Sequence, residues 1–327
     1  MFHFQPIEAR LKSLNYHLEK AMPILTPSGV IMGLLLGPLV SWMNPSVPYL
    51  FGLITFIGGL GISSNAFFGV IKKPKAILFF ILGANIIMPL VAWALANLLF
   101  PGHPEIITGF ILLMAIPTAI TGYIWATIYK GNGALSLTLI IVSTLLAPLL
   151  TPYTVALLAQ TTVQIDTKGM MISLLGMVVI PSIAGILINN ATKGKVNDRV
   201  APNLKPFSKI GLFFIVVINT SQVSERLIAD ASWIYLPIAL ACALLAALGY
   251  PLAHYLGKLA NISLEDRKSV TFAVSMRNIS SALVLAIAYF PPETALPVIF
   301  GIVFQQTICA FMAHTLYGRK KIPYHNR

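Results

Sequence analysis

Three long runs of this sequence contain no Asp, Glu, Lys, Arg or His: residues 21–71, 106–129 and 131–165. Each run is longer than the roughly 20 apolar residues that an α-helix needs to cross the hydrocarbon core of a bilayer. The composition agrees, since 57% of the 327 residues are hydrophobic and 10% are charged, whereas a soluble domain carries about 25% charged residues. The chain is therefore predicted to be an all-α integral membrane protein that crosses the membrane many times.

The positions of the basic residues predict how the chain is oriented. Polar breaks divide it into ten predicted spans, near residues 22–43, 47–71, 76–100, 105–129, 133–158, 168–191, 206–228, 231–257, 268–290 and 293–317. With the N-terminus in the cytoplasm, all but three of the 22 Lys and Arg residues fall on the cytoplasmic side, the exceptions being Lys168, Arg226 and Arg277. Because cytoplasmic loops are enriched in Lys and Arg, we expect a multi-pass protein of the plasma (inner) membrane with both termini cytoplasmic. The net charge of +12 is then a sign of topology, and no nucleic-acid partner is expected.

The ten predicted spans form two sets of five, and because five is odd the second set must insert upside down relative to the first. Spans three and eight carry weakly similar stretches, MPLVAWALANLL (Met88–Leu99) and YPLAHYLGKLA (Tyr250–Ala260). Inverted repeats are common in secondary transporters, whose binding sites lie at mid-membrane where helices are interrupted. The expected organisation is a cytoplasmic N-terminal surface helix at 1–21, a first five-helix repeat at 22–158, a linker at 159–167, a second five-helix repeat at 168–318 and a cytoplasmic basic tail at 319–327.

Spans four and nine are each predicted to be interrupted. Span four contains Pro117, which lacks a backbone N–H, and Gly122 follows five residues later. Span nine contains the stretch FAVSMRNISS, in which Arg277 is the only charged residue and is surrounded by Ser and Asn side chains. The pairing of these two interruptions at corresponding positions indicates a transport site between them.

Three stretches resemble the bile acid/sodium symporter family and its bacterial relatives that carry small organic anions. They are Pro117 with YKGNGALSLTLIIVSTLLAPLLTP (Tyr129–Pro152), RKSVTFAVSMRNISSALVLA (Arg267–Ala286) and GLGISSNAFFGVIKKPKAIL (Gly59–Leu78). The resemblance covers nearly the whole chain. It implies ten transmembrane helices in a panel domain and a core domain, with broken helices four and nine crossing in the core. It also implies a binding site beside the crossing and transport by alternating access.

At the positions aligned by this resemblance, most oxygen donors of the family's sodium sites are absent. The residues in the equivalent places are Ala84, Gly122, Tyr123, Ser136, Ile140, Ala273 and Arg277. Of these, only Ser136 keeps the family's residue; a helix-three glutamine is replaced by Ala84, and a helix-nine glutamate and glutamine are replaced by Ala273 and Arg277. The family's substrate-contacting asparagine is matched by Asn278.

Arg277 is the residue whose position most needs an explanation. It lies ten residues beyond Arg267, which corresponds to a depth of roughly 15 Å at 1.5 Å per residue. An unpaired charge there costs about 2.5–3.5 kcal/mol. In one interpretation, the guanidinium bonds carbonyls of the broken helices or faces a water cavity and only fastens the crossing. In the other, its permanent charge takes the place of sodium and also holds an anionic substrate, which suits the bidentate fork of arginine.

Other polar side chains are candidates for the substrate site. The predicted set is Thr118, Thr121, Arg277, Asn278, Gln305 and Gln306. Asn85 and the clusters at 63–65 and 219–222 extend this set as further candidates. The two cysteines, Cys242 and Cys309, lie in apolar segments without a metal-binding or disulfide pattern. No cofactor, metal or enzymatic motif is predicted.

The sequence predicts a secondary transporter of small organic anions, either carboxylates or bile-acid-like compounds, with membrane lipid as its surroundings. In the first hypothesis transport is independent of sodium because Arg277 replaces the ion. In the alternative, sodium is a partner and its ligands are redistributed to residues such as Ser136, Asn85 and Gln305. A remote alternative is a membrane receptor that does not transport.

Overall fold

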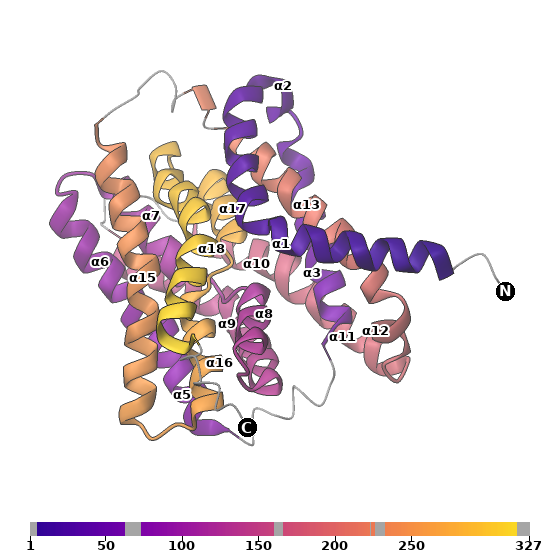
Figure 1. The fold of residues 1–327 in the computed structure, drawn as a ribbon. Helices are drawn as coiled ribbons and strands as arrows, with labels where there is room; N and C mark the ends of the chain where they lie inside the picture. Colours follow the sequence, from indigo (N-terminus) through magenta and orange to yellow (C-terminus); the bar gives the residue numbers. More distant parts are fainter. Residues whose placement is uncertain (1–4, 63–72, 160–165, 223, 226–232, 319–327) are drawn as a thin grey trace, which may run out of the picture.

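The computed structural model describes residues 5–62, 73–159, 166–222, 224–225 and 233–318. Within these ranges the chain is helical apart from turns and short connections (Figure 1), with one isolated antiparallel bridge between Thr118 and Arg277. The candidate cluster at 63–65, the basic tail at 319–327, most of the predicted linker at 159–167 and Arg226 lie outside the described residues.

Helices of very different lengths follow one another along the chain. In order they are α1 (Gln5–Leu36), α2 (Pro38–Ser41), the 3₁₀ turn η1 (Asn44–Ser46), α3 (Val47–Leu60), α5 (Pro74–Ile81), the π-helical turn η2 (Leu82–Ile87), α6 (Met88–Leu99), α7 (Pro104–Ala115), α8 (Ile120–Ile128), α9 (Gly133–Leu158), α10 (Thr167–Leu174), the π-helical turn η3 (Leu175–Val179), α11 (Ile180–Ala191), α12 (Lys195–Arg199), α13 (Ala201–Ser221), α15 (Tyr235–Leu259), α16 (Leu264–Ser275), α17 (Ile279–Tyr289), the 3₁₀ turn η4 (Pro292–Thr294) and α18 (Ala295–Tyr317). The predicted boundary at residue 21 falls inside the continuous helix α1.

Six helical segments in the described part of the chain are long and apolar enough to cross a membrane. They are Pro74–Leu99, Gly133–Leu158, Thr167–Ala191, Ala201–Ser221, Tyr235–Leu259 and Pro292–Tyr317. Large apolar side chains stand exposed on several of them, such as Leu157 with 82% of its surface accessible. Such surfaces are stable against lipid and costly against water. The all-α membrane class is thus confirmed, while the count of ten spans in two inverted repeats stays a prediction.

The helices pack as two groups. In the first, called the four-helix group, α1 packs on α13, and α3 packs on both α11 and α13. In the second, called the crossover group, α5 to α9 and α15 to α18 pack on one another. Figure 1 shows α6, α7 and α15 at the left and α3, α11 and α13 at the right. Glycine permits the close approach inside the four-helix group, because a Cβ on Gly33 would lie 2.5 Å from the Val217 carbonyl oxygen.

Candidate functional site

Two interrupted helices cross within the crossover group. Residues 116–119 separate α7 from α8, and residues 276–278 separate α16 from α17. In the first break Pro117 has no N–H to continue the helix, and in the second Met276 has an extended backbone with φ −95° and ψ 111°. Both interruptions therefore lie where the sequence predicts them.

Backbone hydrogen bonds join the two breaks. The Asn278 N–H donates to the Pro117 carbonyl oxygen over 2.9 Å, and the Ala119 N–H donates to the Met276 carbonyl oxygen over 2.9 Å. A helix end leaves backbone groups without partners inside the helix, so this exchange satisfies some of them. The break region consequently brings together two helix C-termini, those of α7 and α16, with the N-termini of α8 and α17. Helix C-termini carry partial negative charge and N-termini partial positive charge.

Thr118 is built into this crossing. Its hydroxyl donates to the Met276 carbonyl oxygen over 2.9 Å, and its N–H donates to the Ser143 hydroxyl oxygen of α9 over 2.9 Å. The side chain is buried. The first bond joins the two breaks and the second ties them to α9. A contact from Thr118 to a substrate stays a prediction.

Arg277 lies at the centre of the hydrogen bonds that link the crossing to its neighbours. With 1% of its surface accessible, it is the largest fully buried side chain among the described residues. Its Nη2 donates to the Ala84 carbonyl oxygen over 2.6 Å, and its Nη1 donates to the Ile116 carbonyl oxygen over 3.3 Å. Its backbone N–H donates to Gln305 Oε1 over 2.8 Å. The guanidinium therefore donates its hydrogen bonds to backbone carbonyl oxygens. No carboxylate of the described residues pairs with it.

Local sequence explains why these two carbonyls are free to accept. The Met88 N–H reaches back to Gly83 in the π-helical turn η2, so the next donor in that register would be residue 89. That residue is Pro89, which has no N–H, and the Ala84 carbonyl is left without a partner inside its helix. Ile116 follows the last residue of α7, where carbonyls likewise lack intrahelical donors. Arg277 supplies both missing hydrogen bonds.

The positions that the resemblance aligns with sodium sites offer few side-chain oxygens in the structure. Ala84 and Ala273 are buried and have no polar atom in their side chains. The Ser136 hydroxyl donates to the Asn132 carbonyl oxygen of its own chain segment over 3.1 Å. A Cβ on Gly122 would lie 3.2 Å from the Phe272 carbonyl oxygen, so a side chain there would crowd α16.

The remaining predicted substrate residues are partly brought together. Asn278 caps α17, its Oδ1 accepting from the Ser281 N–H over 3.4 Å. Gln305 is linked to the crossing through the Arg277 N–H, whereas Gln306 Oε1 accepts from the Trp125 Nε1–H over 3.2 Å. Roles in binding substrate stay predictions for all of these residues.

A hydroxyl at the start of α8 has no partner in this state. The Thr121 Oγ1 is buried, and no hydrogen bond is found for it among the described residues. Helix α8 begins at Ile120, so this hydroxyl lies in the first turn of a helix whose N-terminus is at the crossing.

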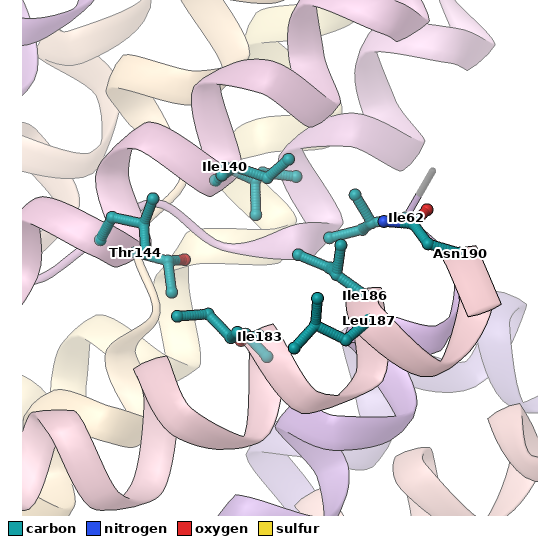
Figure 2. A pocket seen from close by; sticks show the side chains of 10 residues that line it. Ile62, Ile140, Thr144, Ile183, Ile186, Leu187 and Asn190 are labelled. Atoms are coloured by element: carbon teal, nitrogen blue, oxygen red, sulfur yellow. The ribbon is translucent and has the colours of Figure 1, made fainter. Parts of the chain in front are cut away.

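An apolar cavity of about 380 Å³ lies between α9 and α11. Figure 2 shows Ile183, Ile186 and Leu187 of α11 on one side of it and Ile140 and Thr144 of α9 on the other. The complete lining is Ile62, Ile140, Ile141, Thr144, Leu145, Ser182, Ile183, Ile186, Leu187 and Asn190. None of these side chains is charged. Thr144 follows Ser143, which binds the crossing, so the cavity runs along the same helix that supports the break.

Several parts of this site are missing from the sequence-based set. They are the carbonyls of Ala84 and Ile116, the hydroxyl of Ser143, and Thr151, whose Oγ1 donates to the Ala115 carbonyl oxygen over 2.8 Å. A backbone carbonyl is present in every residue and gives no signal of its own. Pro89 is the local signal that could have pointed to Ala84.

The sequence is similar to one family model and to several known proteins. A sequence model described as the Sodium Bile acid symporter family matches residues 47–230. The Uncharacterized protein YbaS of Bacillus subtilis (strain 168) is 38% identical over 295 residues, which cover 90% of this chain and 96% of that protein. The Uncharacterized sodium-dependent transporter YocS of the same organism is 30% identical over 268 residues, with 82% and 81% covered.

A plant protein extends this set. The Probable sodium/metabolite cotransporter BASS1, chloroplastic, of Arabidopsis thaliana is 26% identical over 283 residues, which cover 86% of this chain and 69% of that protein. Relatives named by their activity are transporters and not enzymes, which confirms the expectation from the absence of enzymatic motifs. The family match, the identity to YbaS and the crossing of two broken helices agree, and the chain belongs to the sodium bile acid symporter family.

Proposed function

We propose that this protein is a secondary transporter of small organic anions that works by alternating access without sodium, with the guanidinium of Arg277 in place of the bound ion. The observation that carries the proposal is the 2.6 Å bond from Arg277 Nη2 to the Ala84 carbonyl oxygen. Both residues occupy positions where, by resemblance, the family has sodium-site glutamines. The fixed guanidinium thus connects positions 84 and 277, which by resemblance would otherwise both bind a sodium ion.

The electrostatics of the crossing support a permanent positive charge. The C-terminal ends of α7 and α16 point their partial negative charge at the breaks. Sodium neutralises such ends by accepting carbonyl oxygens as ligands, and a buried guanidinium does the same through N–H donors. Arg277 is buried, so its positive charge stays at the crossing throughout the transport cycle. No ion from the medium is then needed to supply that charge.

The other half of each broken helix supports an anionic substrate. The N-termini of α8 and α17 present backbone N–H groups and partial positive charge at the crossing. Thr121 and Asn278 lie at these N-termini and supply a hydroxyl and an amide. A carboxylate fits this set of donors.

The apolar cavity supports a substrate with a hydrocarbon portion. Seven of its ten lining residues are Ile or Leu, and none is charged. A carboxylate at the crossing with an apolar body along α9 would use both features. Substrates with several charges are disfavoured because the cavity wall offers them no partner.

Architecture and location are part of the same proposal. We infer ten spans in two inverted repeats in the plasma (inner) membrane, with both termini in the cytoplasm. The four-helix group and the crossover group supply the two bodies that alternating access requires. The location rests on the distribution of Lys and Arg along the chain.

A sodium-coupled mechanism is the second candidate, because YocS is named as a sodium-dependent transporter and BASS1 as a probable sodium/metabolite cotransporter. In that case the ion would need oxygens from residues such as Ser136, Asn85 and Gln305. Gln305 already binds the Arg277 N–H through its Oε1. The charge of Arg277 beside it would also repel sodium, which makes this candidate the weaker one.

Uptake into proteoliposomes distinguishes the two candidates. Purified protein is reconstituted, and uptake of labelled pyruvate, succinate and cholate is measured with an inward sodium gradient and with choline in its place. The proposal expects uptake of at least one monocarboxylate, equal within twofold in the two media. A steep, saturable dependence on sodium would establish the symporter instead, and uptake of none of the three would contradict the proposed substrate class.

A further inference from the structure

Asn219 of α13 is a buried amide without a hydrogen-bond partner. Its side chain has 1% of its surface accessible. Neither its Nδ2 nor its Oδ1 has a partner among the described residues. Buried amides are almost always hydrogen-bonded, because an unpaired one loses its bonds to water without replacement. The unpaired amide of Asn219 therefore calls for a partner that the described residues do not supply.

The direction of this side chain follows from the neighbours of α13, since successive residues of an α-helix are turned by about 100°. Thr220 faces α1, because a Cβ on Gly33 would lie 2.7 Å from the Thr220 Cβ. Gly211 faces α3, because a Cβ on Gly211 would lie 3.2 Å from Ile54 Cδ1. Phe214 is exposed and marks the outward side. Asn219 is turned by about 80° from Gly211, about 100° from Thr220 and about 140° from Phe214.

Asn219 therefore points between α1 and α3 and away from the outward side of the four-helix group. Within the crossover group, α17 makes the main contact with α13. The amide thus lies at the interface between the two groups.

Counted from basic residues at the predicted cytoplasmic end, Asn219 is expected at the depth of the crossing. It is ten residues beyond Lys209, and Arg277 is ten residues beyond Arg267. Both distances correspond to about 15 Å along a helix, measured from basic residues at the predicted cytoplasmic end. The N-terminus of α17, capped by Asn278, begins at this level.

The interface between the two helix groups is closely packed on the outer side of Asn219 and less closely packed on its cytoplasmic side. Toward the predicted outer end, α10 packs on α9 and α17, and Tyr289 of α17 donates to the Gly169 carbonyl oxygen over 2.9 Å. Toward the predicted cytoplasmic end, the cavity separates α9 from α11, and Ser208 and Leu212 on the Asn219 side of α13 are only half-buried. Asn219 sits at the boundary, where separation of the two groups at the outer end would uncover it.

We propose that Asn219 is the substrate-binding residue contributed by the four-helix group. When the groups separate at the outer end, its Nδ2–H donates to a carboxylate oxygen of the substrate, opposite Asn278 and the N-terminus of α17. With the two groups packed together at the outer end, neither polar atom of this amide has a partner among the described residues. This inference rests on the proposed function, because the partner is the carboxylate of the transported anion.

The test compares Asn219→Leu with Thr220→Val in proteoliposomes. Thr220 is the matched control, because its Oγ1 is also buried without a partner among the described residues but faces α1. Each change removes an unpaired polar group, so neither is expected to lower the melting temperature. For the monocarboxylate among pyruvate and cholate that the wild-type protein takes up, Asn219→Leu is expected to raise KM at least tenfold. Thr220→Val should leave KM within twofold.

A labelling experiment provides a second measurement that needs no transport by the variant. Asn219→Cys and Thr220→Cys are treated from outside with a membrane-impermeant maleimide. Labelling of position 219 alone, slowed at least threefold by the same monocarboxylate, is the expected result. Equal KM values for Asn219→Leu and wild type, or no labelling at 219, would overturn the inference while leaving the proposed function intact. Absence of uptake by the wild-type protein itself would overturn the proposed function and this inference with it.

Discussion

Arg277 donates a 2.6 Å hydrogen bond from its Nη2 to the carbonyl oxygen of Ala84, a residue 193 positions earlier in the chain. The acceptor is free because Pro89 provides no N–H to the π-helical turn that contains Ala84. The donor is free because it has no carboxylate partner in the described part of the chain. The bond therefore ties the α5–η2–α6 segment to the crossing of the broken helices.

Replacement of this guanidinium is expected to stop transport. Arg277→Gln removes the charge that compensates the ends of α7 and α16, and uptake should fall tenfold or more. It also leaves the carbonyls of Ala84 and Ile116 without donors, at a cost of about 1–3 kcal/mol of stability for each buried group. Arg277→Lys should restore uptake only in part, because an ammonium lacks the planar fork that reaches two carbonyls. Uptake and thermal unfolding are measured together, with Arg199→Gln on the exposed helix α12 as the control. If the Arg277→Gln protein folds normally and takes up substrate at the wild-type rate, Arg277 has no role in transport.

A sodium site can be partly rebuilt at the same place. Ala273→Glu combined with Arg277→Gln restores two residues that the family has by resemblance and returns a carboxylate to the crossing. We expect this double variant to regain some uptake, and to do so only when sodium is present. Ala84 and Tyr123 still lack the family's oxygens, so recovery should be incomplete. Uptake by the double variant is compared in sodium and choline media, and recovery that is equal in both would contradict the idea of a substituted ion.

The contact between Gly169 and Tyr289 is expected to hold the outer end closed. Tyr289 OH donates to the Gly169 carbonyl oxygen over 2.9 Å and is 2.5 Å from the Ser173 hydroxyl oxygen. A Cβ on Gly169 would lie 2.2 Å from Asp166 Oδ2 and 2.6 Å from Cε1 of the Tyr289 ring, so Gly169→Ala should displace both side chains and open this interface. The expected result is faster maleimide labelling of Asn219→Cys from outside. Gly176→Ala is the control, because its Cβ would meet no atom within 4 Å, and equal labelling of the two alanine variants would refute a closing role for this contact.

Asp266 is expected to stabilise the protein above pH 4 and to lose this effect in acid. Burial raises the pKa of this carboxyl. Hydrogen bonds from Lys73 and Asn132, together with Ser263 and the charge of Lys73, outweigh burial and bring the pKa below its ordinary 3.8. Because the folded pKa is the lower one, the stabilisation is fully present above the unfolded pKa and is lost as pH falls through the folded pKa.

Thermal unfolding between pH 3 and pH 7 tests this dependence. Asp266→Asn should cost about 1–3 kcal/mol at pH 7, and its difference from the wild type should shrink below pH 4. Asp198→Asn, at an exposed carboxylate of α12, should change neither stability nor its pH dependence. If the difference in stability between wild type and Asp266→Asn stays constant down to pH 3, the charge of this carboxylate does not stabilise the start of α16.

The proposed orientation is tested by labelling from the two sides of the membrane. Lys168 and Lys195 are both exposed and lie on opposite sides in the proposed topology. In intact cells, a membrane-impermeant maleimide should label Lys168→Cys, and it should label Lys195→Cys only after the membrane is permeabilised. Labelling of Lys195→Cys in intact cells would contradict the proposed orientation and the division into ten spans.

The sequence by itself determined the class of the protein and the places where its helices break. Runs such as 106–129 exclude a soluble fold because of their length and lack of charge. Pro117 interrupts a helix because it has no N–H, and Arg277 with the Ser and Asn residues around it marks the second break. These properties depend on residues that are neighbours in the chain, so no tertiary contact is needed to predict them.

Only the tertiary structure decided which groups meet at the crossing. The partners of Arg277 are carbonyls of Ala84 and Ile116, and a carbonyl belongs to every residue, so no residue type in the sequence marks it. The cavity between α9 and α11 and the buried amide of Asn219 depend on how helices that are distant in the chain pack on one another. One-dimensional patterns of hydrophobicity and charge do not contain this packing.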